Sequence, residues 1–236
     1  MSRAFNVVAA LHQPKKNYYD GAIQQSESIR NHFVRLKQAE EVEFRERLSS
    51  TSLPHTHVVN INDAKVVERV AEAQVDIVLL FGTEILGEHW LRTFPKRIVN
   101  LHLGLSPFYR GAATLFWPFV NKELACVGAT IHLAVERVDA GGILRQIRAN
   151  PQIGDTYYSV TTRLIRRSIE MVPSVVSDYL SGAIQPLPQS AASTRAYRMG
   201  DFNEAALKQA LDFIGDGITR EQIEDAERST KCGFSQ

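Results

Sequence analysis

The strongest restriction on the fold comes from Val75–Phe81, whose sequence VDIVLLF is apolar at every position except Asp76. Such runs are typical of strands that are covered on both faces, as in parallel sheets with helices on each side. Two further strand candidates, Ala4–Leu11 and His57–Ile61, are each followed by a segment of helical composition. This alternation of strand and helix predicts an α/β fold with a doubly wound, mostly parallel sheet.

The other elements are predicted from periodicity and from turn residues. Strands are expected at 98–102 and 127–135, and helices at about 23–48, 63–73, 88–94, 111–120 and 155–180. A proline-containing segment at 185–190 marks a boundary. We therefore expect a main domain over 1–185 and a small C-terminal subdomain over 186–236, with helix candidates at 203–215 and after Thr219.

Two polar side chains mark the end of the strand candidate Ile98–His102. Side chains alternate between the faces of a strand, so Asn100 and His102 point to the same side. Turn residues such as Pro107 follow, and the strand ends of open α/β sheets are where such folds bind ligands. An amide beside an imidazole can bind and deprotonate a ligand, although both side chains could instead satisfy backbone groups of the loop.

An aspartate follows the second buried strand candidate, Val127–Val135. Asp139 lies directly before Ala-Gly-Gly, just past the end of that strand. It could serve the same site as Asn100 and His102, or it could simply cap the glycine-rich turn.

Together these motifs resemble those of the folate-dependent formyltransferases. The shared pattern is Asn-x-His, then Leu-x-Pro-x-Tyr-Arg-Gly-Ala, then Val-Asp-x-Gly-x-Ile-Leu, all within 98–144. The resemblance is strongest over 75–146 and fainter over 4–73, and it implies a Rossmann-like formyltransferase fold. In that family, Ala4–Leu11 matches the second strand. Either the family's first strand is absent here, or Ala4–Leu11 takes its place.

The resemblance also implies a reaction and a set of site residues. A formyl group would pass from 10-formyltetrahydrofolate to an amine, with Asn100 as oxyanion donor, His102 as base and Asp139 orienting His102. No metal is expected. The residues implied to hold the folate are Ile85 and Leu86 in one loop, Glu136 and Val138 in another, and Arg110, whose alternative role is a surface salt bridge.

For the acceptor, the resemblance favours the sugar-nucleotide N-formyltransferases. A core followed by a short tail is typical of those enzymes, which act on amino-dideoxysugars carried by dTDP. Other acceptors remain open: hydroxyornithine, glycinamide ribonucleotide or methionyl-tRNA. A non-catalytic module that binds folate or a nucleotide sugar is a further alternative.

The loop after the first strand candidate is the predicted binding place for the acceptor's pyrophosphate. It combines two cations with two aromatic rings, in Lys15, Lys16, Tyr18 and Tyr19. The alternative is a solvated basic loop. The tail beyond about Ser190 is expected to form a homodimer, because it has too little bulk for a core of its own yet carries several apolar residues: Tyr197, Met199, Phe202, Leu207, Leu211 and Phe213.

Composition argues against several other classes of protein. Lys plus Arg is 27 and Asp plus Glu is 26, so the basic excess of a nucleic-acid-binding surface is absent. No apolar run approaches the ~20 residues that span a bilayer. Cys126 and Cys232 lack metal-ligand spacing, so we expect a reduced pair in a cytoplasmic protein.

Overall fold

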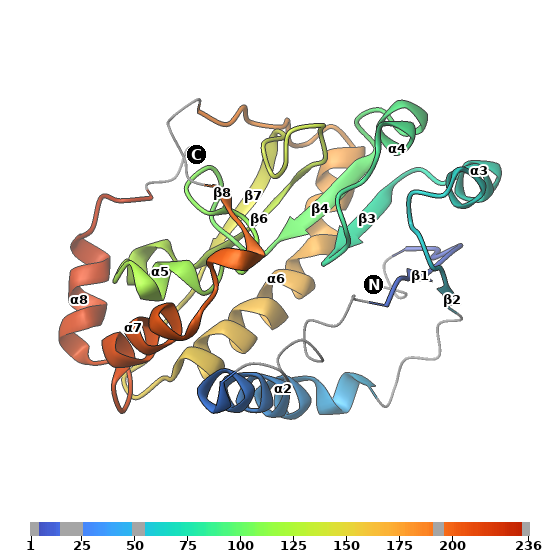
Figure 1. Cartoon of the computed structure of the whole chain (residues 1–236). Coiled ribbons are helices and arrows are strands. Elements are labelled where there is room, and N and C mark those ends of the chain that lie inside the picture. The colour runs from blue at the N-terminus through green and yellow to red at the C-terminus, as the bar shows by residue number, and fades with distance from the viewer. Residues whose placement is uncertain (1–4, 15–25, 49–54, 191–195, 233–236) are drawn as a thin grey trace.

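The centre of the molecule is a four-stranded sheet (Figure 1). The structure, a computed structural model, describes residues 5–14, 26–48, 55–190 and 196–232. The strands lie in the order β3 (Val78–Phe81), β4 (Ile98–His102), β6 (Gly128–Leu133) and β7 (Ile143–Arg148). β3 and β4 are parallel, whereas β6 is antiparallel to both of its neighbours. The predicted α/β fold is confirmed.

Helices cover both faces of this sheet. α6 (Tyr157–Leu180) contacts β4, β6 and β7, and α2 (Glu27–Leu48) packs against α6. A second apolar cluster joins α3 (Ala64–Glu72), α4 (Glu88–Thr93) and the start of β4. No helix in the described ranges is long and apolar enough to cross a bilayer.

Two of the predicted helices start at residues whose side chains cap the first turn. The Asp63 side chain accepts a hydrogen bond from the Lys65 amide, which fixes the start of α3 as the sequence suggested. Thr156 and Ser159 cap each other's backbone amides at the start of α6. α6 therefore begins at Tyr157, two residues later than expected.

The N-terminal strands differ from the prediction. β1 is only Leu11–His12, and it pairs in parallel with β2, only Thr56–His57, in a separate two-stranded sheet. Near these strands, Val8 is 52% exposed and Val59 94% exposed, whereas Val58 and Ile61 are buried in the second apolar cluster. In the described part of the chain, β3 is hydrogen-bonded to β4 alone. The described residues of that strand candidate, 5–11, therefore do not take a place beside β3.

The prediction of a helix over 111–120 is also wrong. Its first residues form β5 (Arg110–Gly111), and the helix is reduced to α5 (Trp117–Val120). Gly111 and Ala113 have φ values of 93° and 54°, which interrupt a right-handed helix.

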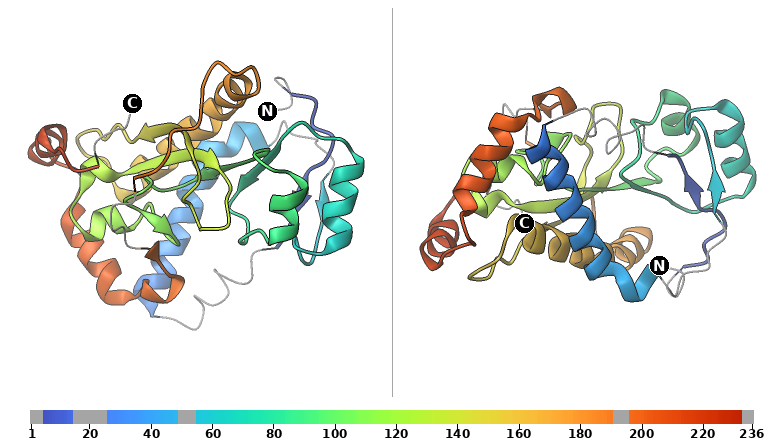
Figure 2. Two further views of the ribbon diagram at one scale, coloured as in Figure 1. Left: turned by 90° about the horizontal axis from the view of Figure 1, so that it is seen from above. Right: turned by 60° about the horizontal axis from the view of Figure 1, so that its bottom comes forward.

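The C-terminal segment packs onto the core of the same chain. β8 (Ala196–Tyr197) pairs in parallel with β5, although the two strands are far apart in sequence. A 3-10 turn at Met199–Asp201 leads to α7 (Glu204–Ile214) and then to α8 (Arg220–Arg228). These helices lie at the opposite end of the molecule from β1 and β2 (Figure 2). Both helix candidates in the tail are confirmed.

This packing removes the reason for expecting a dimer through the tail. Tyr197 is 7% exposed and Leu207 1% exposed, and both belong to the main core cluster of their own chain. Among the apolar tail residues singled out above, Met199 remains largely exposed, at 44%. Self-association stays a prediction, without the apolar face that suggested it.

We expect the tail to contribute directly to stability. Leu207→Ala should lower the free energy of unfolding by about 2–5 kcal/mol, because it opens a cavity in the core. Lys208→Ala, next to it, is the control: Lys208 is exposed and pairs only with Asp212 on the surface, so its loss should cost less than about 1 kcal/mol. Urea unfolding measures both. Equal and small losses would show that the tail does not rest on the core.

The two cysteines form a disulfide, which corrects the expected reduced pair. Cys126 and Cys232 are bonded, with their Cα atoms 5.5 Å apart and 106 residues apart in sequence. α8 packs against the 3-10 turn Leu124–Cys126, which brings Cys232 to Cys126. Sequence spacing cannot reveal such a contact, because it depends on how the tail folds back.

Candidate functional site

The structure brings Asn100, His102 and Asp139 together at the middle of the sheet. Asn100 and His102 lie on one side of β4, with side chains alternating as predicted. The Asp139 Oδ1 atom is 3.4 Å from His102 Nδ1 and 3.4 Å from Asn100 Nδ2. The side chains of His102 and Asp139 are only 6% and 9% exposed. The three predicted residues thus form one buried cluster.

A backbone amide from β5 holds the aspartate in place. The Gly111 N–H donates to Asp139 Oδ2 over 2.9 Å. Gly111 has φ 93°, and a Cβ atom there would lie 2.2 Å from the Tyr197 carbonyl oxygen of the neighbouring strand β8. Only glycine fits between the aspartate and the tail.

The hydrogen bonds of His102 decide which of its nitrogens is basic. Its Nε2 lies 2.8 Å from the Tyr109 carbonyl oxygen, so Nε2 carries a proton and Nδ1 faces Asp139. Burial lowers the pKa of His102, and the negative charge of Asp139 partly opposes that shift. The imidazole of His102 is therefore neutral at neutral pH, and a proton gained at Nδ1 would face the carboxylate of Asp139.

The pKa of Asp139 is held below its ordinary value. Burial alone would raise this pKa, but the neighbouring imidazoles of His132 and His102 and the N–H of Gly111 together lower it. Asp139 is therefore ionised at neutral pH and stabilises a proton on a neighbouring imidazole.

A second histidine completes the cluster, and sequence reasoning missed it. His132 on β6 is paired directly with Asn100 across the sheet. Its Nε2 lies 3.3 Å from Asn100 Nδ2 and 3.5 Å from Asp139 Oδ1, and the residue is 2% exposed. From the sequence alone, the apolar run around His132 predicts simply a buried strand. Pairing residues 128–133 antiparallel to residues 98–102 would have placed His132 beside Asn100.

The cluster lies in a cavity of about 1280 Å³. Its wall includes residues 80–86 of β3 and the following loop, residues 111–116, and parts of α2, α6 and the tail. Away from the cluster, an aromatic region is lined by His32, Phe33, Phe116, Tyr157 and Phe202. Burial lowers the pKa of His32 to about 4, so this region is uncharged at neutral pH. Pockets for one small molecule usually measure about 300–1,000 Å³, so there is room here for two substrates.

The predicted folate residues divide into two groups. Ile85, Leu86 and Val138 line the cavity. Glu136 is exposed and Arg110 is buried, and neither is part of the described lining. The Arg110 side chain lies near Asp139, and its Nε has no partner in the described residues, so the alternative of a surface salt bridge is not what the structure shows.

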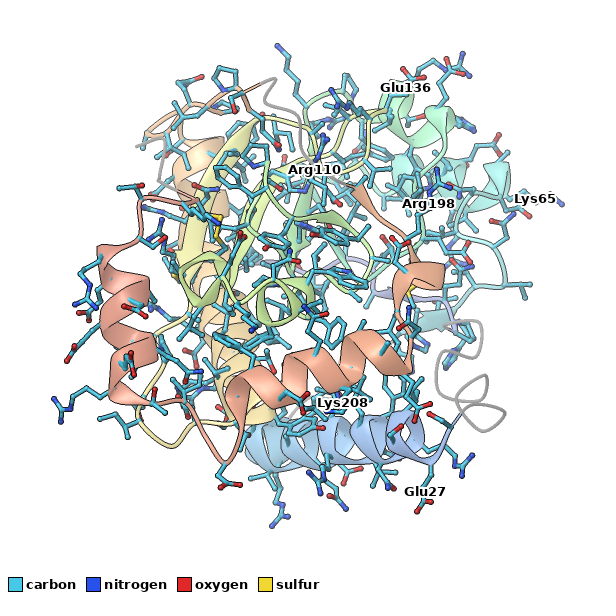
Figure 3. The ribbon with its side chains drawn as sticks, turned by 60° about the vertical axis from the view of Figure 1, so that its left-hand side comes forward. Glu27, Lys65, Arg110, Glu136, Arg198 and Lys208 are labelled. Atoms are coloured by element: carbon cyan, nitrogen blue, oxygen red, sulfur yellow. A yellow bond between two sulfur atoms is a disulfide. The ribbon has the colours of Figure 1, made fainter. Side chains whose placement is uncertain are left out.

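The predicted acceptor residues Lys15, Lys16, Tyr18 and Tyr19 lie outside the described residues. Another cation does reach the cavity: Arg198, which follows β8. Figure 3 labels Arg198 together with Arg110, which comes from the paired strand β5.

Comparison with solved structures gives the same fold. A sugar N-formyltransferase from a Shewanella species has a TM-score of 0.57 and 18% identity, over 86% of this chain and 87% of that one. PseJ from Anoxybacillus kamchatkensis, solved with UDP-4,6-dideoxy-4-formamido-L-AltNAc and tetrahydrofolate, has a TM-score of 0.53 and 21% identity, over 76% and 91%. Phosphoribosylglycinamide formyltransferase from Streptococcus pneumoniae is 26% identical, with a TM-score of 0.50, over 57% and 79%.

The sequence itself matches a family model over most of the chain. The model is described as Formyl transferase, and it matches residues 4–176. That range contains Asn100, His102, His132 and Asp139, and so the buried cluster belongs to the matched part of the chain. The protein is therefore a member of the formyl transferase family of enzymes.

Proposed function

We propose that the protein transfers a formyl group from 10-formyltetrahydrofolate to the amine of a nucleotide-linked amino sugar. The observation that carries this proposal is the cluster of Asn100, His102 and Asp139 in a cavity with room for two substrates. Acyl transfer to an amine needs a base and a hydrogen-bond donor for the carbonyl oxygen, and the cluster offers both.

In the proposed reaction, the acceptor's amine nitrogen forms a bond to the formyl carbon, and the bond from that carbon to the folate nitrogen breaks. His102 takes the proton that the attacking amine loses, and the proton passes to the departing folate nitrogen. Asn100 donates to the formyl oxygen as it becomes negative; one such donor contributes roughly 3 kcal/mol. Asp139 stabilises the charged form of His102.

The loop after β3 supports the proposed donor site. The Asn62 side chain holds this loop from outside the cavity: its Nδ2 donates to the Ile85 carbonyl, and its Oδ1 accepts from the Gly87 amide. Ile85 is 68% exposed and lines the cavity. A loop fixed in this way can present backbone groups to a flat heterocycle, which fits a folate, as does the tetrahydrofolate bound in PseJ.

Although Glu40, Glu84 and Asp139 also line the cavity, one cation in its wall supports an acceptor that carries phosphate. Arg198 is the one Arg or Lys among the described residues that line the cavity. A guanidinium binds phosphate oxygens in pairs. From the sequence we favour a dTDP-linked 4-amino-4,6-dideoxyhexose, and the UDP-sugar bound in PseJ is of the same chemical class.

The direct test incubates the protein with 10-formyltetrahydrofolate and a panel of amines. The panel contains dTDP- and UDP-linked amino sugars, hydroxyornithine and glycinamide ribonucleotide. Mass spectrometry should show one added carbonyl group on a nucleotide sugar alone. Formylation of another amine would show that the acceptor belongs to another chemical class. Binding of the donor without transfer to any amine would favour a binding module.

We expect Arg198→Ala to raise the acceptor's KM by about 10-fold or more and to leave the donor's KM nearly unchanged, because it removes a charged contact made in the bound state. Arg220→Ala, in the exposed first turn of α8, is the control and should change neither value. Steady-state kinetics with each substrate varied in turn gives the comparison.

The same measurement on Lys15→Ala with Lys16→Ala tests the site that the sequence predicted. A large effect there and none at Arg198 would place the pyrophosphate on the N-terminal loop. Equal effects of Arg198→Ala on donor and acceptor would argue against an acceptor-specific contact.

A further inference from the structure

A backbone carbonyl decides which ring nitrogen of His132 carries the hydrogen in the neutral imidazole. Its Nδ1 lies 2.7 Å from the Leu133 carbonyl oxygen, which can only accept, so Nδ1 carries the proton. In the neutral ring, Nε2 is then an acceptor, and it is Nε2 that lies 3.3 Å from Asn100 Nδ2. His132 thus offers Asn100 a lone pair.

Two acceptors determine which way the Asn100 amide faces. His132 Nε2 and Asp139 Oδ1 are 3.3 Å and 3.4 Å from Asn100 Nδ2, and both require a donor. If the amide were reversed, its carbonyl oxygen would face a lone pair and a carboxylate, which is unfavourable inside a protein. His132 and Asp139 therefore hold the NH₂ group inward.

Toward the described residues, the geometry also leaves one N–H of Asn100 unused. The two acceptors are 3.5 Å from each other, so with Asn100 Nδ2 they form a nearly equilateral triangle. The angle between the two N–H bonds of a planar amide is much wider than the angle at Asn100 Nδ2 between the directions to the two acceptors. One N–H is shared between the two acceptors, and the other points away from them. Asn100 itself lines the cavity.

We propose that His132 is a positioning residue: by accepting from Asn100, it fixes the amide so that the second N–H is available to the substrate's carbonyl oxygen. This inference rests on the proposed formyl transfer, but it assigns His132 a role of its own. His132 itself does not touch the reacting atoms; it acts through Asn100.

Kinetics of matched variants test the proposal. His132→Phe keeps a ring and removes the acceptor, so kcat should fall by about 10–100-fold, less than the 10²–10³-fold loss of an oxyanion donor itself. The KM values of both substrates should change less than about 2-fold. His132→Gln keeps a side-chain carbonyl that can accept, and it should recover most of the lost kcat.

A double-mutant cycle separates positioning from general damage to the site. In an Asn100→Ala background, His132→Phe should cost no further activity, because the group it positions is gone. Additive losses, or a His132→Gln variant as slow as His132→Phe, would overturn the proposal. Circular dichroism on each variant checks that the fold is retained.

A second measurement does not depend on turnover. In the ¹⁵N spectrum, the side-chain NH₂ signals of Asn100 are those that Asn100→Ala removes. One of the two protons should exchange slowly with solvent in the wild type and in His132→Gln, and quickly in His132→Phe. Unchanged exchange in His132→Phe would overturn the inference even in an active enzyme. If the wild type showed the expected exchange pattern but no turnover, the proposed formyl transfer would be contradicted, whereas the positioning of Asn100 by His132 would stand.

Discussion

An enzyme carrying His102→Asn should turn over about 10²–10⁴-fold more slowly than the wild type, the usual contribution of a general base. Asparagine can keep a hydrogen bond to a neighbour, but it cannot take up a proton at neutral pH. The fold should survive, because the polar contacts of His102 with the described residues are one backbone carbonyl and Asp139. Affinity for the folate donor should also be nearly unchanged.

Turnover and donor binding are measured separately, by product formation and by calorimetry. His89→Asn on α4 is the control, because His89 is not part of the described cavity lining. Retention of more than about a tenth of the wild-type turnover in His102→Asn would show that another group is the base.

The pH profile gives an independent check on the same residue. Burial lowers the pKa of His102 below its ordinary value of 6.5, and only the unprotonated form can act as a base. Activity should therefore fall as the pH drops through the pKa of His102, which lies below 6.5. This acidic limb should disappear in His102→Asn.

Loss of the Cys126–Cys232 disulfide should lower the free energy of unfolding by about 3–5 kcal/mol. The crosslink closes a separation of 106 residues, and constraint of so long a loop in the unfolded chain is worth up to ~5 kcal/mol in the chain-entropy account. In a chain of this size, that change corresponds to a drop in Tm of roughly 10 °C.

Thermal unfolding of Cys126→Ser, Cys232→Ser and the double variant measures this effect. All three should unfold at about the same temperature, because each lacks the same bond. Adding a reductant should lower the Tm of the wild type to theirs and leave the double variant unchanged. A wild type indifferent to reductant would show that the bond contributes little or that it is absent in solution.

Much of the sheet could be predicted because strong local patterns coincide with burial. Ile98–His102 is a strand with the expected bounds, and its two polar residues stand out against apolar neighbours that are buried in the sheet. The site could be predicted from the same strand together with Asp139, because these residues belong to one recognisable motif.

Other features could not be predicted because they depend on contacts between distant segments. β5 and β8 are two residues each and carry no periodic signal; they exist because the tail returns to Gly111. Ala4–Leu11 has the composition of a buried strand, yet its described residues, 5–11, have no partner in the main sheet. His132 is polar within an apolar run, and only the register opposite Asn100 reveals its place.

The pairing of β5 with β8 has a consequence for how the enzyme becomes active during synthesis. Gly111 holds Asp139 through its N–H, and the next residue, Ala112, donates its own N–H to the Tyr197 carbonyl. The ribosome makes Asn100, His102, His132 and Asp139 well before Tyr197. When Asp139 has just left the exit tunnel, the nascent chain carries all four side chains but lacks strand β8, which braces them. Competence for transfer should therefore arise only after residue 197 has also left the tunnel.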